Sequence, residues 1–487
     1  MAGRLRFWLN KKPIASFCRY LKLTRQLDAM ADLSFHDRHW QLVSDTPKPA
    51  TSRWVPAQKP RIAIVCDPLN HAYFSAAAQL FPLPSDPEAA RDIFEQNAPQ
   101  LLLVVSPWTG LVGEWKHLTT RPDRTAALVA IVAIAREKGI PTAFLSHEDP
   151  PHFDEFLPLA RQFDTILTTA QECIEDYRKI LGHDRVFLLP FGVNPLVHNP
   201  LGITQTPAID EVLFAGSYMG MFPERCADFH ALAAAAGERL RIIDRQYTYP
   251  RRGNPLRHYR GAALFFSPEF SPRVAPKLGS GDLSLLQRHF AATINLNTVT
   301  DSQTMYSRRV PESLAMGNLV LSNASPGMVN RYPEVVVDDV AAAVARGPVW
   351  QSRLSGIRRV LACDTVFHRM AVLCAACGLD YPALPTRVVA VVPEGVDLDN
   401  QTLAPAAIVA PGQPIPSCDA VWHPAPGPIA PTALQDAMAA FCYADIDFAR
   451  PAAPGETPFV LTEAFEPAGA IVWAGRPTAR GLTLPAN

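Results

Sequence analysis

The feature that most restricts the fold of this chain is a repeated alternation of short apolar runs with helix-like segments between residues 61 and 192. The apolar runs are rich in β-branched residues and end in polar or turn residues, which is typical of buried strands. We predict strands over 61–67, 99–108, 140–149, 163–170 and 185–192, and helices over 125–139 and 173–182. Strands that alternate with helices in this way predict a doubly wound parallel sheet with helices on both faces.

A second unit of the same kind follows. We predict strands over 210–220 and 240–247, a helix followed by a strand over 284–299, and another such pair over 311–323, where Gly317 ends the helix. Neither unit carries the glycine pattern of a nicotinamide-binding turn, which disfavours a nicotinamide-dependent oxidoreductase. Two tandem Rossmann-like units without that pattern predict a GT-B fold, whose two lobes face a central cleft.

Length and composition divide the chain further. Its 487 residues suffice for two or three domains, and 48% hydrophobic with 19% charged residues is an ordinary globular balance. Residues 386–487 contain fifteen prolines, which favour turns and extended segments. We therefore expect four parts, which are a helical extension (1–58), an N-terminal Rossmann-like domain (59–200), a C-terminal Rossmann-like domain (201–382) and a small C-terminal module (383–487).

The charge is balanced overall and uneven locally. A formal net charge of −1 gives no support for nucleic acid as a partner. Residues 1–60 hold eleven Lys/Arg against four Asp/Glu, an excess of seven positive charges. This excess fits a solvated arm, or an arm that contacts an anionic membrane or a lipid-linked acceptor. Without an apolar run of signal-peptide or membrane-helix length, we expect a cytoplasmic protein, with peripheral contact at the inner face of the membrane as an open alternative.

No metal site is expected. The nine cysteines are dispersed and odd in number, which argues against a disulfide framework, and Cys374 and Cys377 form a lone CxxC without a second pair of ligands. Asp445 and Asp447 spell a DxD, the metal-binding pattern of GT-A enzymes. Because no Rossmann-like unit is completed before it and such a triplet is common by chance, we interpret it as structural.

The most informative block runs from Asn295 to Asn323. A strand ends in polar residues, a loop follows, and a short helix is predicted to start near Arg309, because Pro311 is tolerated in a first turn. Arg308 and Arg309 at such a helix start can neutralise a diphosphate. Glu312 lies one turn further, where it can accept hydrogen bonds from ribose hydroxyls. The alternative is a surface arginine pair with Glu312 as a first-turn acid.

Two other strand ends carry polar residues. The segment 215–220 places Gly216 and Ser217 after a strand, where small residues let the backbone approach a phosphate, although an ordinary tight turn fits equally well. The segment 146–156 places His147, Glu148, Asp149 and His152 at the mouth of the first sheet. These four are the candidates for a general base, and the alternative is a turn shaped by Asp149 with a solvated histidine.

The motifs of this chain resemble those of the CgeB-like (spore-maturation-type) glycosyltransferases, a GT-B group. The family pattern lNvNsvtdSptMfsRRvfEllAcG is similar to NLNTVTDSQTMYSRRVPESLAMG at 295–317. Two further elements match, LSHEDPPHFDEFLPLARQFDTILTTA (145–170) and LLPFGVNPLVHNP (188–200), and SPWTGLVGEW (106–115) is similar to a third. The resemblance spans about residues 60 to 380.

The resemblance implies that the N-terminal domain binds the acceptor and the C-terminal domain binds a nucleotide-sugar donor. It implies a donor site lined by Asn297, Ser302, Met305, Arg308, Arg309 and Glu312, with Gly216 and Ser217 at the diphosphate. Glu148 and Asp149 would face the acceptor or the sugar.

The chain also departs from the family pattern. His147 stands where the pattern has Lys, Ala170 where it has Asp, Val105 where it has an acid, and Thr304 where many GT-B enzymes carry a second Glu. Long relatives continue with a GT-A domain. Only the tail of such a domain is recognisable here, so residues 383–487 are interpreted as its degenerate remnant.

The function we expect is transfer of a sugar from a nucleotide-diphosphate donor to a glycan, glycolipid or protein, as in surface polysaccharide synthesis. A UDP-sugar is the expected donor, with no cofactor and no metal, because arginines and helix N-termini can neutralise the leaving diphosphate. The proposed catalytic residues are His147, Glu148, Asp149 and Arg308. The alternative is a non-catalytic GT-B scaffold that binds a partner glycosyltransferase or a glycan, which the altered first-domain positions favour.

Overall fold

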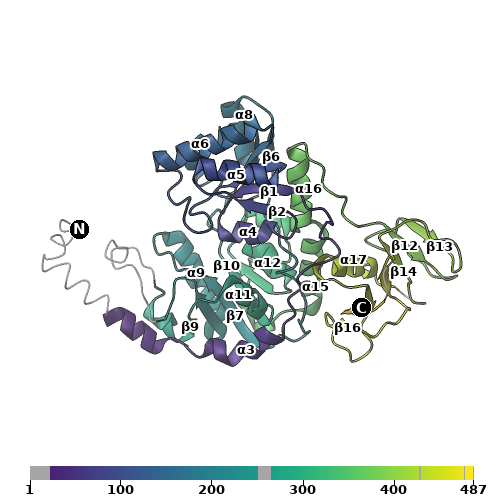
Figure 1. Ribbon diagram of the computed structural model, residues 1–487. Coiled ribbons are helices and arrows are strands. Elements are labelled where there is room, and N and C mark those ends of the chain that lie inside the picture. Colours follow the sequence, from purple (N-terminus) through teal and green to yellow (C-terminus); the bar gives the residue numbers. More distant parts are fainter. Residues whose placement is uncertain (1–21, 250–264, 427–428, 476–477, 486–487) are drawn as a thin grey trace.

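The computed structural model describes residues 22–249, 265–426, 429–475 and 478–485. Figure 1 shows two α/β lobes, one above the other, with a smaller unit beside them. Five of the seven excess positive charges of residues 1–60, for which a solvated arm and a membrane-contacting arm were the alternatives, fall on residues 1–21, outside the described residues. None of the described helices combines the length and the apolar character needed to cross a bilayer.

The first lobe is built on a six-stranded parallel sheet with the order β2-β1-β3-β4-β5-β6. Its strands are β1 (Arg61–Val65), β2 (Gln79–Pro82), β3 (Leu101–Val105), β4 (Thr142–Ser146), β5 (Thr165–Thr168) and β6 (Val186–Leu188). Its helices are α4 (Pro68–Phe74), α5 (Pro87–Asn97), α6 (Pro122–Glu137), α7 (Phe153–Ala160) and α8 (Ile174–Leu181). All five residues of β3 are buried, because helices cover both faces of the sheet.

The second lobe has a five-stranded parallel sheet with the order β11-β10-β7-β8-β9. Its strands are β7 (Ile209–Gly216), β8 (Leu240–Asp244), β9 (Val274–Ala275), β10 (Phe290–Asn295) and β11 (Leu319–Ser322). Its helices are α9 (Pro223–Ala236), α11 (Ser280–Gln287), α12 (Arg309–Ala315), α13 (Pro326–Arg331) and α14 (Val340–Arg346).

The part of the N-terminal extension around residues 35–45 packs on the second lobe. Helix α3 (Phe35–Asp45) contacts α11 and lies below the second sheet in Figure 1. Phe35 is fully buried in a cluster with Ile243, Leu286 and Phe290. Burial of a phenylalanine side chain contributes about 2 kcal/mol, so α3 covers apolar surface that the sheet would otherwise expose.

Two helices connect the lobes again after the second sheet. Helix α15 (Trp350–Cys363) packs on α12 of the second lobe, whereas α16 (Val366–Ala376) returns to α4 of the first. Between them, Thr365 pairs with Val193 in an isolated parallel bridge. Two doubly wound lobes joined by a returning helix form a GT-B fold, which confirms the predicted fold class.

The C-terminal unit contains a seven-stranded mixed sheet with the order β13-β12-β14-β17-β15-β18-β16, in which β17 is antiparallel to both neighbours. Its elements are β12 (Val388–Val391), β13 (Ala407–Val409), β14 (Ala420–Trp422), α17 (Ala433–Tyr443), β15 (Phe448–Pro451), β16 (Leu461–Thr462), β17 (Ile471–Trp473) and β18 (Gly481–Leu484). One hydrophobic cluster includes Ile64 of the first lobe, Met370 of α16 and Trp422 of β14. The unit therefore shares its core with the rest of the protein.

An arginine from the connector before the first lobe occupies the DxD of this unit. Arg53 Nη2 lies 2.6 Å from Asp447 Oδ1, and Arg53 Nη1 lies 3.2 Å from Asp445 Oδ1. Its Nε donates to the Ile446 carbonyl at 2.8 Å. The guanidinium thus supplies the positive charge that two neighbouring carboxylates require. This arrangement agrees with the structural interpretation of the DxD.

Candidate functional site

The carboxyl ends of the two parallel sheets meet at one place, which we call the interlobe junction. It consists of the loops after β1, β3, β4, β5 and β6 of the first lobe and the loops after β7, β8 and β10 of the second. Ligands of open α/β folds bind beyond the carboxyl ends of the strands. The contact that defines the junction joins Arg308, which precedes α12, to His147, which follows β4, at 3.2 Å.

Arg308 belongs to the second lobe by sequence and contacts the first lobe with its side chain. Its Nη2 donates to Asn70 Oδ1 at 2.6 Å. The guanidinium carbon lies 5.5 Å from the ring centre of Tyr73 and 5.1 Å from that of Phe191. Two aromatic rings and two polar partners hold the cation in one position. Burial lowers the pKa of Arg308, and the nearby Glu312 carboxylate opposes this effect.

Arg309 points toward the end of β7. Its Nη2 donates to the Ala215 carbonyl at 2.6 Å, next to Gly216. Burial lowers the pKa of Arg309 to about 10, Glu312 opposes this, and the charges of Arg225 and Arg245 add to it. Arg309 remains protonated at neutral pH, within reach of two further arginines.

Within the part of the chain that the structure describes, this group of arginines has no carboxylate within ion-pair distance. Among the described residues, Arg225, Arg245, Arg308 and Arg309 form no ion pair within 4.0 Å. Arg225 instead donates to the carbonyl oxygens of Ser217 and Tyr218 at 3.3 and 3.1 Å. Glu312 is the acid that acts on both Arg308 and Arg309. The edge of the second sheet therefore carries an excess of positive charge, as an anion site does.

The turn after β7 is tight at Gly216 and open beyond it. A side chain at Gly216 would meet the ring of Phe214 at 2.8 Å, so glycine is required there. The Gly216 carbonyl accepts from the Arg245 backbone N–H at 3.0 Å, and Ser217 Oγ accepts from Gln246 at 3.3 Å. Helix α9 starts only at Pro223, so its N-terminus does not follow the turn directly.

Two predicted donor-site residues shape the loop after β10. Asn297 is 3% exposed, and its Oδ1 accepts from the Ser307 backbone N–H at 3.2 Å while its Nδ2 donates to the Asn323 carbonyl at 3.0 Å. Ser302 is also 3% exposed, and its Oγ accepts from the Met305 backbone N–H at 2.9 Å. Both side chains hydrogen-bond to the loop backbone. They therefore position the loop within the junction.

The same loop is fastened to the first lobe. Thr304 Oγ1 donates to the Thr169 carbonyl at 3.0 Å and accepts from the Gln171 backbone N–H at 2.9 Å. Met305 packs against the hydrophobic core of the first lobe. Thr304 stands where many GT-B enzymes carry a second glutamate, and here this position joins the lobes.

The candidate bases after β4 have different surroundings. Asp149 is fully buried, and its oxygens accept from Thr168 Oγ1 at 2.6 Å and from Tyr177 Oη at 3.3 Å. Burial raises the pKa of the Asp149 carboxyl, and the Thr168 hydroxyl opposes that shift. The side chain lies inside the first lobe, where it stabilises the loop and does not face the junction.

Glu148 is half-buried near Trp108 and His152. Burial raises the pKa of its carboxyl, and the Trp108 side chain, His152 and Arg308 oppose the shift. The Trp108 ring is 38% exposed and stacks edge-on with the His152 ring at 4.9 Å. A carboxylate with a raised pKa beside an exposed aromatic ring suits a general base.

Glu312 has a neighbour that sequence reasoning missed. His198, in the segment that connects the lobes, lies 3.9 Å from Glu312, and burial lowers the pKa of this histidine while Glu312 opposes the shift. Asn70, Arg225 and Arg245 were missed as well. Arg245 comes directly after β8. Asn70 and Arg225 lie in the first turns of α4 and α9, the helices that follow β1 and β7. Polar residues just after a predicted strand or at the start of the next helix were the signal that could have found them.

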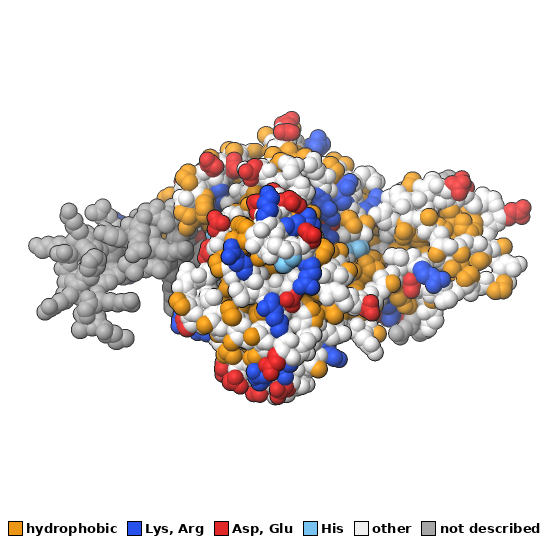
Figure 2. Space-filling view, turned by 90° about the horizontal axis from the view of Figure 1, so that it is seen from above, with side chains coloured by type: hydrophobic (Ala, Val, Ile, Leu, Met, Phe, Trp, Pro, Cys, Tyr) orange, Lys and Arg blue, Asp and Glu red, His pale blue; other side chains and the backbone are white. Residues whose placement is uncertain are grey.

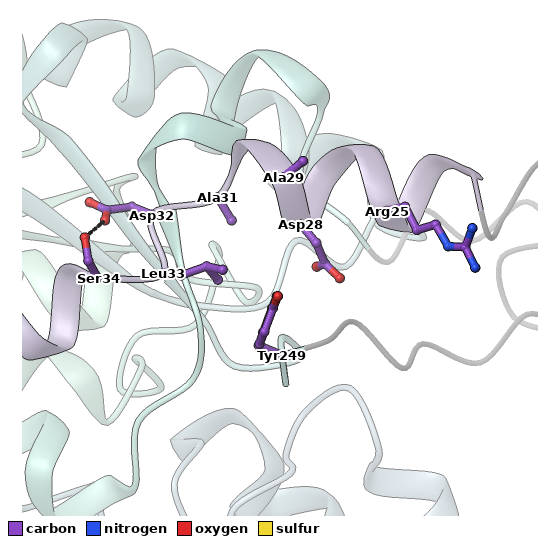
Figure 3. A pocket seen from close by; sticks show the side chains of 8 residues that line it. All are labelled: Arg25, Asp28, Ala29, Ala31, Asp32, Leu33, Ser34 and Tyr249. Atoms are coloured by element: carbon purple, nitrogen blue, oxygen red, sulfur yellow. Dashed lines mark hydrogen bonds between the residues drawn. The ribbon is translucent and has the colours of Figure 1, made fainter.

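A hollow of about 620 Å³ lies elsewhere, between the helix at 22–30 and the turn that leads into α3. Figure 3 shows Asp28 and Tyr249 directed toward one another across it. Tyr249 and the helix at 22–30 lie next to residues that the structure does not describe, so we assign no ligand to this hollow.

In Figure 2, acidic and basic side chains alternate over the central part of the visible face, a pattern unlike the basic stripe of nucleic-acid-binding surfaces.

The described cysteines are all free. Burial raises the pKa of Cys374 to about 11 and that of Cys377 to about 12, so both remain protonated thiols at neutral pH. Protonated thiols are poor nucleophiles. Cys374 is fully buried in the hydrophobic core, where it contributes to the packing of α16.

No protein-family model matches the chain, and no curated protein is similar to it. The resemblance to the CgeB-like group therefore stays a prediction. Among solved structures, the N-terminal domain of Candida albicans trehalose-6-phosphate phosphatase is 10% identical over 60% of this chain and 73% of that chain, with a TM-score of 0.37. LpCGTa in complex with UDP is 12% identical over 66% and 100% of the respective chains, with a TM-score of 0.32. An α1,3-fucosyltransferase with GDP is 10% identical over 67% and 97%, with a TM-score of 0.30. Similarity this low carries no information on substrate or reaction. The fold assignment rests on the topology of the sheets.

Proposed function

We propose that the interlobe junction binds a nucleotide-diphosphate sugar and transfers the sugar to a hydroxyl of a glycan, glycolipid or protein. The observation that carries this proposal is the group of four arginines at the edge of the second sheet, without an ion-pair partner among the described residues. A diphosphate brings two or more negative charges to such a group. A UDP-sugar is the donor we expect.

Arg309, Arg225 and Arg245 would bind the diphosphate. When the glycosidic bond of the donor breaks, the leaving diphosphate gains negative charge. Fixed cations in a partly buried site stabilise this charge more in the transition state than in the bound substrate, which accelerates the reaction. Three arginines supply this stabilisation without a metal ion, and Glu312 would accept hydrogen bonds from ribose hydroxyls.

Glu148 is our candidate for the base that activates the acceptor hydroxyl. Asp149 is buried under the loop, and His147 has one ring nitrogen engaged by Arg308. Glu148 remains half-buried at the junction, with a raised carboxyl pKa. It would take the proton of the acceptor hydroxyl as the new bond to the sugar forms.

The test is release of nucleoside diphosphate from a panel of UDP- and GDP-sugars, with and without glycan acceptors. Wild type should release nucleoside diphosphate from at least one donor. Glu148→Gln should lower kcat by 10² to 10⁴-fold, as is usual for loss of a general base, with unchanged donor affinity. Glu394→Gln, an exposed position in the C-terminal unit, is the control. Tight nucleotide binding without any turnover would favour the non-catalytic scaffold, and absence of nucleotide binding would reject the proposed site.

A further inference from the structure

The contact between Arg308 and His147 determines which ring nitrogen of a neutral His147 carries the proton. Arg308 Nη2 lies 3.2 Å from His147 Nδ1. A guanidinium has only donors, so Nδ1 must accept this hydrogen bond. A neutral imidazole has one N–H, and when Nδ1 accepts, the proton sits on Nε2.

Arg308 is held too firmly to release this contact readily. It also donates to Asn70 Oδ1 at 2.6 Å and lies between the rings of Tyr73 and Phe191. The His147 ring packs on Phe191 with a centroid distance of 4.7 Å. Its backbone N–H donates to Ser106 Oγ at 3.0 Å. The imidazole is therefore fixed at its backbone, its face and its Nδ1.

The remaining ring nitrogen is available for a ligand. His147 Nε2 has no hydrogen-bond partner among the described residues. It is also not one of the unpaired polar atoms that are fully shielded from solvent. A small hollow of about 10 Å³ adjoins His147, Arg308 and Tyr73. Next to it, Arg308 Nη1 and Tyr73 Oη are buried and have no hydrogen-bond partner among the residues that the structure describes. A volume of this size is close to the minimum for one water molecule, and a water there would satisfy both atoms and further immobilise Arg308.

We propose that His147 donates a hydrogen bond from Nε2 to an oxygen atom of the nucleotide sugar, and that Arg308 imposes this role by occupying Nδ1. His147 is then a neutral donor in the site and not a base. The identity of the ligand rests on the proposed function, whereas the position of the proton does not. Burial and the Arg308 charge lower the pKa of His147 well below its ordinary value, which keeps the ring neutral.

A neutral donor suits the chemistry of the junction. It can stabilise an oxygen that carries or gains negative charge without transferring a proton to it. The oxygen belongs to a phosphoryl group or to a hydroxyl of the transferred sugar, and both are acceptors. With His147 in this role, Glu148 stays our candidate for the base.

The first measurement is the tautomer of His147, by long-range ¹H–¹⁵N correlation on the full-length protein with ¹⁵N-labelled histidine at pH 7. The spectrum of His147→Asn identifies the signals of His147 by their absence. We expect a protonated Nε2 and an unprotonated Nδ1 without any ligand. Arg308→Met should release this preference. A proton on Nδ1 in the wild type, or a doubly protonated ring, would overturn the proposal.

The second measurement is calorimetric affinity for UDP and for a UDP-sugar in two matched variants. His147→Asn keeps an acceptor near Nδ1 and lacks the Nε2 donor, whereas His147→Gln places an amide donor near Nε2. We expect His147→Asn to weaken binding about tenfold and His147→Gln to weaken it less. Weakening for both ligands assigns the contact to a phosphoryl oxygen, and weakening for the UDP-sugar alone assigns it to the sugar. The reverse order of the two variants would contradict a donor role. If wild type binds neither nucleotide while the tautomer is as expected, the proposed function fails and the arginine–histidine relationship stands.

Discussion

Arg308 Nη2 lies 2.6 Å from Asn70 Oδ1, and this hydrogen bond joins the two lobes. The two residues are 238 positions apart in the sequence. Asn70 is 9% exposed, so its carbonyl oxygen has little access to water. A hydrogen bond to a charged group contributes about 1.5 to 3 kcal/mol. Asn70→Leu should lower the free energy of unfolding by this amount in urea titrations, and Asn70→Asp, which keeps the acceptor, should not. Equal stability of Asn70→Leu and wild type would show that the contact does not hold the lobes together.

Stability should fall as the pH decreases from 6.5 toward 4, partly because of His289. Burial and the Arg288 charge lower the pKa of His289 to about 4, whereas an unfolded chain has a histidine pKa near 6.5. Between these values the unfolded chain binds a proton that the folded chain does not. The stabilisation is complete above pH 6.5 and is lost at about 1.4 kcal/mol per pH unit as the pH falls.

The matched variant for this pH effect is His289→Gln. His289 Nε2 lies 2.8 Å from Thr46 Oγ1, and a glutamine amide can keep that contact. Urea unfolding at pH 7, 6 and 5 should show a shallower pH dependence for the variant than for wild type. Parallel pH profiles would mean that His289 does not resist protonation in the folded state.

Arg53 should be essential for the docking of the C-terminal unit. Arg53 and Asp447 form a largely buried ion pair, and removing the cation leaves the Asp447 carboxylate without its charged partner, which costs about 3 kcal/mol. Arg53→Met should therefore destabilise the protein, and adding Asp447→Asn should restore part of the loss, because the two residues interact directly. Additive effects of the two substitutions, or unfolding of wild type that depends on a metal chelator, would contradict the assignment of this DxD as structural.

The elements around the site follow from local patterns. Helix α12 starts at Arg309 and ends before Gly317, whose φ of 72° is readily adopted only by glycine. Strand β3 is a continuous apolar run that both faces of the sheet bury. Such elements are predictable because the period and the end signals lie within the element itself.

The contacts between elements were not predictable. Asn70 and Thr304 look like ordinary polar loop residues until folding brings the lobes together. Asp149 and Glu148 are adjacent in sequence, yet the first turns inward to Thr168 while the second remains half-buried at the junction. Two short edge strands, β2 and β9, were also missed, because they lack the long apolar run that marks a central strand.

The most direct test of the central claim is calorimetric titration of the full-length protein with UDP and GDP, for wild type, Arg309→Met and Arg346→Met. Arg309 belongs to the arginine group, whereas Arg346 is an exposed arginine on α14. Loss of a bidentate charge-assisted contact to phosphate should weaken binding about 10- to 100-fold. The account predicts binding of at least one nucleotide by wild type, this loss in Arg309→Met and unchanged affinity in Arg346→Met. Equal affinity in all three proteins, or no binding by wild type, would contradict it.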